Sequence, residues 1–297
     1  MPDEPAGGSP FRLPSPVEEL VDPRLEARGV RLVLKRDDLI DPEIPGNKWR
    51  KLKYNLEAAR RSGHDRILTF GGAYSNHIRA TAAAGARFGL RTIGVIRGEE
   101  HLPLNPTLSY AVEQGMTLAY LDRQTYRRKT ESDVTEALRR RFGDFYLVPE
   151  GGSNGLAVRG CAEIPGEITR DFNLVCCPCG TGGTLAGIAA GLRGEREAIG
   201  FSVLRGAHWL DDEIRCLQED AYATTRGRWR VNLDYHFGGY AKATPELLSF
   251  IEDFERRHGL RLDRLYTGKM MYGIFDLADK HTFPTGTMIV AVITGPI

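Results

Sequence analysis

The sequence predicts an α/β fold with mainly parallel sheets. Two observations carry this prediction: short apolar segments alternate with segments of helical periodicity, and the apolar segments lack the polar alternation of a half-exposed strand. Alternating strands and helices are typical of parallel sheets, and strands that are apolar throughout fit sheets covered by helices on both faces. The 297 residues, 41% of them hydrophobic, are enough for two packed lobes or one large one.

The first half of the chain holds five expected strands and four expected helices. Apolar residues three and four positions apart, as in Trp49, Leu52 and Leu56, mark the helical segments. The strands are expected at residues 31–35, 67–70, 92–96, 117–121 and 146–148. The helices are expected from 48 to about 63, from 75 to 88, as a short helix ending at 115, and as one long charged helix reaching about 142.

The second half repeats this pattern. Its strands are expected at residues 173–177, 199–204, 231–235 and 288–293. Its helices are expected at 185–192, 208–219, 245–257 and 269–279.

Charge and composition exclude several classes of partner. Forty Lys and Arg residues against 39 Asp and Glu leave a formal charge of +1, so no overall field points to nucleic acid or to an anionic membrane. No apolar run reaches the roughly 18 residues of a membrane span. Residues 1–10 lack a signal-peptide pattern and are expected to be a flexible leader. Five cysteines without a repeated spacing predict neither a disulfide framework nor a metal site, so we expect reduced thiols and a cytoplasmic location.

Lys48 stands at the expected start of a helix, directly after Gly46 and Asn47. The positive end of the helix dipole disfavours a cation there by roughly 0.3–1 kcal/mol, and Lys51, three residues on, adds like-charge repulsion. Both effects favour the neutral amine, which is the nucleophile that forms a Schiff base with an aldehyde cofactor. Most lysines in first helical turns are solvated surface charges, so this hypothesis depends on the rest of the sequence.

Residues 180–184, Gly-Thr-Gly-Gly-Thr, lie between an expected strand and an expected helix. Glycines there let backbone N–H groups converge on an anion, and the helix N-terminus adds its positive end, so phosphate is the expected guest. The segment is not a dinucleotide fingerprint, because Leu185 stands where the last glycine would be, and it is not a Walker loop. An ordinary tight turn is the alternative that the sequence leaves open.

A second glycine-containing turn, at residues 71–77, has the same position between strand and helix. Ser75 and Asn76 are natural helix caps. Alternatively, they hold a substrate carboxylate together with a donor from His77. Tyr240 and Tyr266 lie in loops of the kind in which α/β sites assemble, although packed core rings are the simpler interpretation of both.

Five motifs, at residues 46–52, 71–79, 150–154, 180–184 and 266–269, resemble in order those of D-cysteine desulfhydrase and 1-aminocyclopropane-1-carboxylate (ACC) deaminase. The resemblance spans roughly residues 30–295. It implies the tryptophan synthase β-like fold of pyridoxal-phosphate (PLP) enzymes, fold type II, with two open, twisted, mainly parallel sheets. It also implies a homodimer, a large PLP-binding domain of residues 1–48 and 155–297, and a smaller inserted α/β domain of residues 49–154.

The resemblance implies the site residue by residue. Lys48 would bind PLP as a Schiff base and then take the α-proton of a small amino-acid substrate, with Ser75 and Tyr266 as further catalytic candidates. The cofactor-binding residues would be Lys48, Asn76, Gly180, Thr181, Gly182, Gly183, Thr184 and Thr294. The substrate-binding residues would be Ser75, Asn76, His77, Tyr240 and Tyr266.

The implied activity is that of a PLP-dependent lyase or deaminase, with β-elimination from D-cysteine giving a keto acid and ammonia as the first expectation. PLP stabilises a carbanion, so the protein need only position it and move protons. ACC deaminases have Tyr-Glu where this chain has Tyr266-Thr267, and they have leucine where it has Thr294. Both differences favour the desulfhydrase. The alternatives are ring opening of the ACC deaminase type, β-replacement as in cysteine synthase, and a protein that binds PLP or another phosphate without turning it over.

Overall fold

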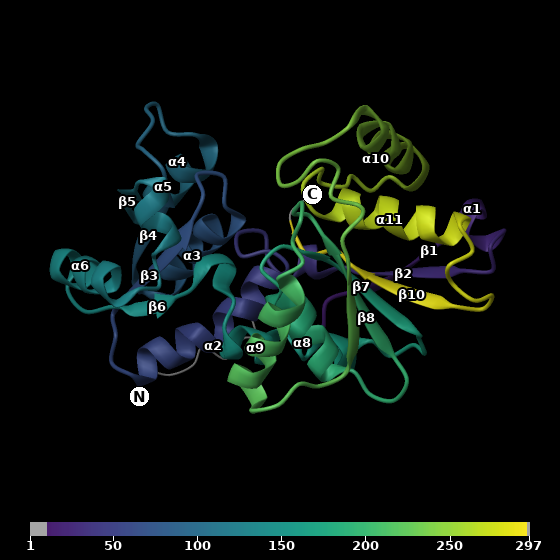
Figure 1. The fold of residues 1–297 in the computed structure, drawn as a ribbon, viewed down its shortest axis with the longest axis horizontal. Coiled ribbons are helices and arrows are strands. Elements are labelled where there is room, and N and C mark those ends of the chain that lie inside the picture. Colours follow the sequence, from purple (N-terminus) through teal and green to yellow (C-terminus); the bar gives the residue numbers. More distant parts are fainter. Residues whose placement is uncertain (1–10, 296–297) are drawn as a thin grey trace.

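The computed structural model describes residues 11–295, which form two sheets lying side by side (Figure 1). The leader expected at residues 1–10 lies outside the described residues. The larger sheet has the strand order β1-β2-β10-β7-β8-β9 and is parallel except for its edge strand β1. Its strands are β1 (Val17–Leu20), β2 (Arg31–Lys35), β7 (Leu174–Cys179), β8 (Glu197–Ser202), β9 (Arg228–Asn232) and β10 (Met288–Val292).

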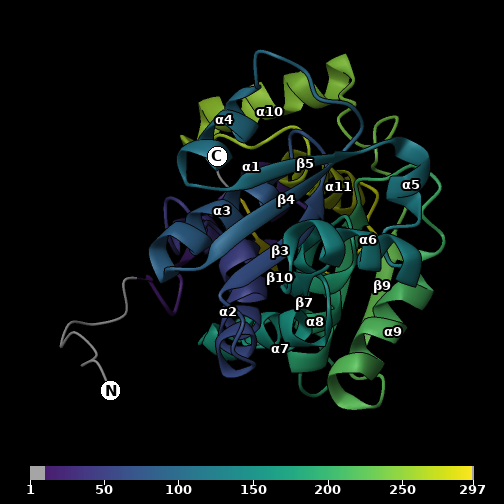
Figure 2. The same ribbon diagram turned by 90° about the vertical axis from the view of Figure 1, so that its left-hand side faces the viewer.

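The smaller sheet has the order β5-β4-β3-β6 and is parallel throughout. All four of its strands come from one continuous stretch of chain, which faces the viewer in Figure 2. That placement is compatible with the inserted domain expected at residues 49–154, a division that stays a prediction. The strands are β3 (Arg66–Gly71), β4 (Arg91–Arg97), β5 (Thr117–Leu121) and β6 (Tyr146–Val148).

Helices cover both faces of the larger sheet, as its uniformly apolar strands require. One apolar core forms under α1, α10 and α11, and a second forms under α7, α8 and α9 on the opposite face. These helices are α1 (Pro23–Glu26), α7 (Gly155–Cys161), α8 (Gly183–Gly191), α9 (Leu210–Tyr222), α10 (Pro245–His258) and α11 (Thr267–Asp279).

The smaller sheet is also covered on both faces. Successive residues of β3 divide between them: Ile67 packs under α2 and α3, and Leu68 packs under α5 and α6. The helices of this lobe are α2 (Asn47–Arg61), α3 (Asn76–Phe88), α4 (Pro106–Glu113), α5 (Arg123–Arg127) and α6 (Ser132–Phe142). No helix within residues 11–295 is long and apolar enough to cross a membrane.

The structure corrects several expectations about these elements, among them β9, which lies at Arg228–Asn232 instead of the expected residues 231–235. The long charged helix expected to reach about residue 142 is two helices, α5 and α6, separated by a turn. The N–H groups of Arg128 and Lys129 bond three residues back instead of four, and Glu131 takes an extended conformation before α6 begins. The edge strand β1 was not expected, because four residues with two glutamates carry little apolar signal.

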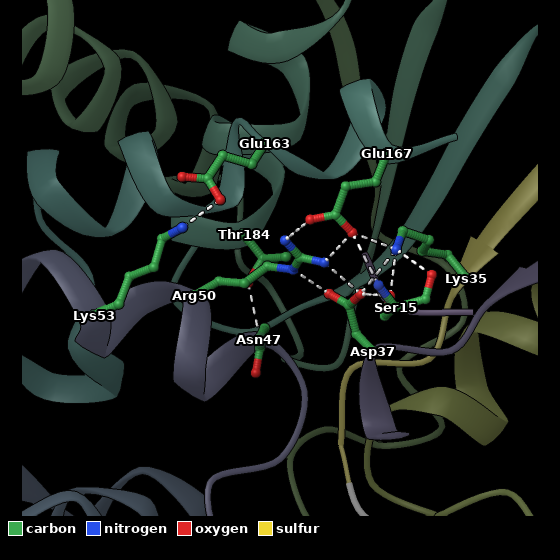
Figure 3. A network of polar contacts seen from close by, with 9 residues as sticks. All are labelled: Ser15, Lys35, Asp37, Asn47, Arg50, Lys53, Glu163, Glu167 and Thr184. Carbon is green, nitrogen blue, oxygen red and sulfur yellow. Dashed lines mark hydrogen bonds and ion pairs between the residues drawn. The ribbon is translucent and has the colours of Figure 1, made fainter. Parts of the chain in front are cut away.

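Helix α2 connects the two lobes. At its contact with α7 a Cβ atom on Gly160 would lie 1.9 Å from the backbone oxygen of Arg50, so only glycine permits this approach. Figure 3 shows the Arg50 side chain extending from α2 toward Asp37 and Glu167. Its Nε and Nη2 donate to the Asp37 carboxylate at 2.6 and 2.8 Å, and both Nη atoms donate to Glu167 at 2.8 Å.

The charges of this cluster are balanced although the groups are buried. Lys35 adds a second cation, bonded to Glu167 at 2.6 Å and to Ser15, whose hydroxyl donates to Asp37. Burial alone would raise the pKa of Glu167, but the hydrogen bonds and charges of Arg50 and Lys35 lower it to about 2. Each ion is therefore stabilised mainly by the others, because buried groups have little contact with water.

Replacing Arg50 should therefore be strongly destabilising. We expect Arg50→Met to lower the free energy of unfolding by roughly 3–5 kcal/mol, because it leaves the two carboxylates with Lys35 as their sole buried cation. Urea denaturation followed by circular dichroism measures this change. The matched control is Arg228→Met, which breaks an exposed pair with Glu195 and should change stability by less than about 1 kcal/mol. Equal losses of unfolding free energy in the two variants would contradict the assignment of Arg50 to a stabilising buried ion cluster.

Candidate active site

A cavity of about 460 Å³ opens where the two lobes meet, at the C-terminal ends of the strands of both sheets. Its walls come from the start of α2, the turn after β3, the turn after β7, and the loops that follow β8, β9 and β10. This is the position at which parallel α/β sheets bind ligands. Ten of the twelve predicted site residues line it: Lys48, Ser75, His77, Gly180, Thr181, Gly182, Thr184, Tyr240, Tyr266 and Thr294.

The other two predicted residues do not line the cavity. Asn76 and Gly183 are the first residues of α3 and α8, one position behind the turns that reach the surface of the cavity. Their predicted roles toward the cofactor and substrate stay predictions.

Lys48 is the second residue of α2, and the preceding backbone fixes where its side chain begins. Gly46 has φ of +62°, and a Cβ there would lie 1.9 Å from the backbone oxygen of Thr294. Asn47 adds an N–H bond to the same oxygen at 3.2 Å, and its side-chain amide donates to the Thr184 hydroxyl at 2.8 Å (Figure 3). The helix that presents Lys48 is therefore attached to both β10 and α8.

Burial, together with the charge of Lys51, lowers the pKa of Lys48 to about 7. The neutral amine expected from the sequence is therefore well populated near neutral pH. The main physical cause is loss of water around the amine, and the expected repulsion from Lys51 is the second cause.

The turn after β7 leads into α8 without a side-chain cap. Its first N–H groups are thus available to an anion, and the positive end of the helix dipole lies there as well. Gly182 has φ of +79°, which a residue with a side chain would rarely adopt. Lys51 approaches the same helix start, because its Nζ would lie 3.3 Å from a Cβ on Gly183. The arrangement has the geometry of a phosphate site.

Ser75 caps α3, since its hydroxyl accepts from the N–H groups of His77 and Ile78. His77 is buried, and burial together with the charges of Lys48 and Lys51 lowers its pKa well below the usual value. The Thr69 hydroxyl donates its one proton to the Val148 carbonyl at 2.8 Å, so the bond between His77 Nε2 and Thr69 Oγ1 requires that Nε2 carry the proton.

His77 Nδ1 is then an unprotonated acceptor, and it has no partner among the described residues. This geometry leaves His77 without a free N–H for a substrate carboxylate, in contrast to the donor role expected from the sequence. The turn that carries Ser75 can still supply backbone and hydroxyl donors.

Two tyrosines, Tyr240 and Tyr266, line the cavity side by side. The rings of Tyr240 and Tyr266 meet edge to face with centroids 6.0 Å apart. Burial, followed by the influence of Tyr240, raises the pKa of Tyr266 well above its usual value, so its hydroxyl stays protonated. The loop that holds Tyr240 contains positive φ angles from Phe237 to Gly239. Buried Lys269 holds this loop, because its Nζ donates at 2.9 Å to the carbonyl oxygens of His236 and Gly239.

The two threonines discussed as substrate determinants have different surroundings. Thr294 lies in the cavity wall. Thr267 is buried outside it, and its hydroxyl donates to Asp263, which also accepts N–H groups at the start of α11.

A family model described as "Pyridoxal-phosphate dependent enzyme" matches residues 9–295. The chain belongs to this family. A putative 1-aminocyclopropane-1-carboxylate deaminase from Pyrococcus horikoshii is 34% identical over 91% of this chain and 85% of its own length. A bifunctional D-cysteine desulfhydrase/1-aminocyclopropane-1-carboxylate deaminase from Arabidopsis thaliana is 32% identical over 90% of this chain and 72% of its own.

Solved structures agree with these matches. The crystal structure of an ACC deaminase homologue superimposes with a TM-score of 0.81 at 31% identity, covering 95% of this chain and 89% of its own. The predicted family resemblance, the type II fold, the cofactor and the assignment as a lyase- or deaminase-type enzyme are therefore confirmed.

The cavity of this PLP enzyme fits its cofactor on two grounds. A lysine whose pKa lies near 7 is suited to reaction with an aldehyde. An uncapped glycine-rich helix start in the same cavity is suited to the phosphate group.

Several residues of this PLP enzyme were missed by reading the sequence. Lys51 was expected only to tune Lys48, yet it is buried, and its Nζ donates to the Gly151 carbonyl and the Ser153 hydroxyl at 3.1 and 3.0 Å. Its place in the motif shared with Lys48 was the available signal. Arg97 and Trp209 also line the cavity, and no local pattern marks either of them.

Replacing Gly183 by a larger residue should weaken cofactor binding. A Cβ there would lie 2.6 Å from Ser153 Oγ and close to Lys51, so Gly183→Val must move the turn that we expect to hold the phosphate. We expect PLP to bind more than tenfold more weakly, about 1.4 kcal/mol or more. Fluorescence titration of the apoenzyme with PLP measures the change. Gly166→Val is the control, because a side chain there meets open space, and PLP affinity in the two variants should differ clearly.

Proposed function

We propose that this enzyme catalyses β-elimination on a small amino acid resembling D-cysteine, giving a keto acid, ammonia and a thiol. The observation that carries the proposal is the placement of Lys48, with a pKa of about 7, in the same cavity as the uncapped start of α8. Bound PLP supplies the electron sink for a carbanion at the substrate Cα. Everything else is positioning and proton transfer by the chain.

Lys48 acts as the base in this proposal. With a pKa of about 7, a substantial fraction of its amine is neutral at pH 7 and most of it is neutral above that pH, so it can take the Cα proton of a substrate held in the cavity. The attachments of Asn47 to Thr294 and Thr184 hold the start of α2 and so limit the directions from which the amine can approach.

The substrate carboxylate is assigned to the turn before α3, where Ser75 offers its hydroxyl beside the positive end of that helix. Tyr266 keeps its proton because burial raises its pKa, so it is suited to donate to the departing sulfur atom. Tyr240 packs against it and holds it in place.

The preference for β-elimination over ring opening is based on Thr294. It lies in the cavity wall and brings a neutral hydroxyl where ACC deaminases have leucine. Thr267, at the position of their glutamate, brings no charge either, and its hydroxyl is occupied by Asp263. A neutral wall gives a weaker electron sink, which is sufficient for a thiolate leaving group but not for an unactivated cyclopropane ring.

We also propose that the enzyme acts as a homodimer in the cytoplasm. The dimer is supported by resemblance to the family. The reducing compartment is supported by four buried free thiols, at Cys161, Cys176, Cys177 and Cys179, and by one exposed free thiol at Cys216.

Lys48→Ala should abolish the absorbance of the covalently held cofactor without unfolding the protein. Mass spectrometry after borohydride reduction should find the pyridoxyl group on Lys48 in the native enzyme and on no lysine of the variant. Lys51→Ala should still carry the pyridoxyl group on Lys48 but bind PLP more weakly, because the Lys51 side chain extends from α2 to the start of α8. The control is Lys53→Ala. Lys53 lies on the same helix as Lys48 and Lys51, and its substitution breaks only an ion pair with Glu163. A pyridoxyl group found elsewhere in native protein would refute the assignment.

With saturating PLP, the enzyme should release sulfide and pyruvate from D-cysteine faster than it releases 2-oxobutyrate from ACC. The physical reason is that Thr267 supplies no carboxylate where ACC deaminases have glutamate, and that Thr294 adds only a neutral hydroxyl. Coupled assays for the two keto acids measure both rates on one preparation. Faster turnover of ACC would contradict the proposed reaction while leaving the PLP site unchanged.

A further inference from the structure

Three aromatic side chains surround the mouth of the cavity. Tyr74, Trp209 and Tyr240 are 67%, 49% and 39% exposed, and all three line the cavity. They come from three separate loops, which follow β3, β8 and β9. Every exposed aromatic side chain within residues 11–295 lies at this mouth, whereas the other large exposed apolar residues of that range are aliphatic.

The fold does not account for this aromatic mouth. Within the described chain the side chains of Tyr74 and Trp209 make no hydrogen bond, ring contact or cation–π contact, so neither stabilises a neighbouring element in this way. Burying a large aromatic side chain lowers the free energy. A cluster of exposed aromatic side chains around a concave site therefore marks a surface for an apolar ligand.

The position of the mouth identifies which part of a substrate would contact these rings. Lys48 and the start of α8 form the cofactor end of the cavity, and the substrate Cα must come within reach of Lys48. A substituent beyond Cβ is then the part that extends toward the mouth.

We propose that the enzyme takes cysteines whose sulfur carries a large apolar group, aryl or aralkyl, and that Tyr74 and Trp209 determine this specificity. The proposal rests on the β-elimination proposed above. The Cα–H proton passes to Lys48, the Cβ–S bond breaks, and its electron pair leaves with sulfur as a thiolate. The remaining enamine takes up one water and yields pyruvate and ammonia, while the thiolate gains a proton and departs as a thiol.

The charges at the mouth are compatible with such a group. Glu150 is paired with Lys129 at 3.1 Å, so its charge is compensated. Arg97 makes no ion pair with another described residue and also lines the cavity. Its guanidinium lies over the Tyr126 ring, 6.0 Å from the ring centroid, so this cation is already paired with an aromatic ring of the fold.

The first test compares kcat/KM for S-benzylcysteine and for cysteine, each as D and L enantiomers, on the holoenzyme. We expect the S-benzyl substrate of the accepted hand to be favoured at least tenfold. In Trp209→Ala and Tyr74→Ala the ratio of the two kcat/KM values should fall at least tenfold, mainly through KM. Leu248→Ala, on α10 and 40% exposed but outside the cavity, should keep the native ratio.

The second test measures binding without turnover. The change in cofactor absorbance in the first phase after stopped-flow mixing, before elimination, should show S-benzylcysteine binding to the holoenzyme at least tenfold more tightly than cysteine, and Trp209→Ala should remove this difference. Elimination from cysteine together with equal or weaker binding of the S-benzyl compound would overturn the specificity and leave the proposed reaction intact. Tight, Trp209-dependent binding of the S-benzyl compound without elimination would support the apolar site and overturn the reaction.

Discussion

The start of α2 is pressed against the end of β10 so closely that no side chain fits at Gly46. The contact places Asn47 within reach of both the Thr294 carbonyl and the Thr184 hydroxyl, and one residue later it places Lys48 in the cavity. Further along the same turn, Arg50 is bonded to Asp37 and Glu167 of the larger lobe. A close backbone contact, hydrogen bonds and an ion pair thus all act on the same helical turn, and this turn forms part of the cavity wall.

The same packing determines the chemistry of the amine. Enclosure between two lobes removes water from Lys48 and Lys51, which disfavours the charged form of each and lowers both pKa values. Lys51 compensates by donating to Gly151 and Ser153, next to the helix start that suits a phosphate. Two lysines three residues apart therefore have different surroundings: Lys48 makes no side-chain hydrogen bond to another described residue and faces the cavity, whereas Lys51 is bonded beside the start of α8.

Two helices that begin at the cavity, α3 and α8, differ in how their first turns are capped. α3 is capped by Ser75, whose hydroxyl already accepts from its own helix, whereas α8 has no side-chain cap and leaves its first N–H groups free. An uncapped buried helix end leaves N–H groups without partners, which is the feature that suits this helix start to an anion. Buried Lys269 plays a similar supporting role for the strained loop that carries Tyr240.

The sequence by itself determined the alternation of strands and helices, the positions of most elements, and the motifs that hold Lys48 and residues 180–184. Those signals are local: apolar periodicity, and glycines between a strand and a helix. The hydrogen-bonding state of His77 could not be read in this way, because it depends on Thr69 donating to Val148. The surroundings of Thr267 and the partners of Arg50 likewise follow from the folded chain. Only the tertiary structure assembled Tyr74, Trp209 and Tyr240 around one cavity, because the three loops are far apart in the sequence and meet only where parallel strands bring their ends together.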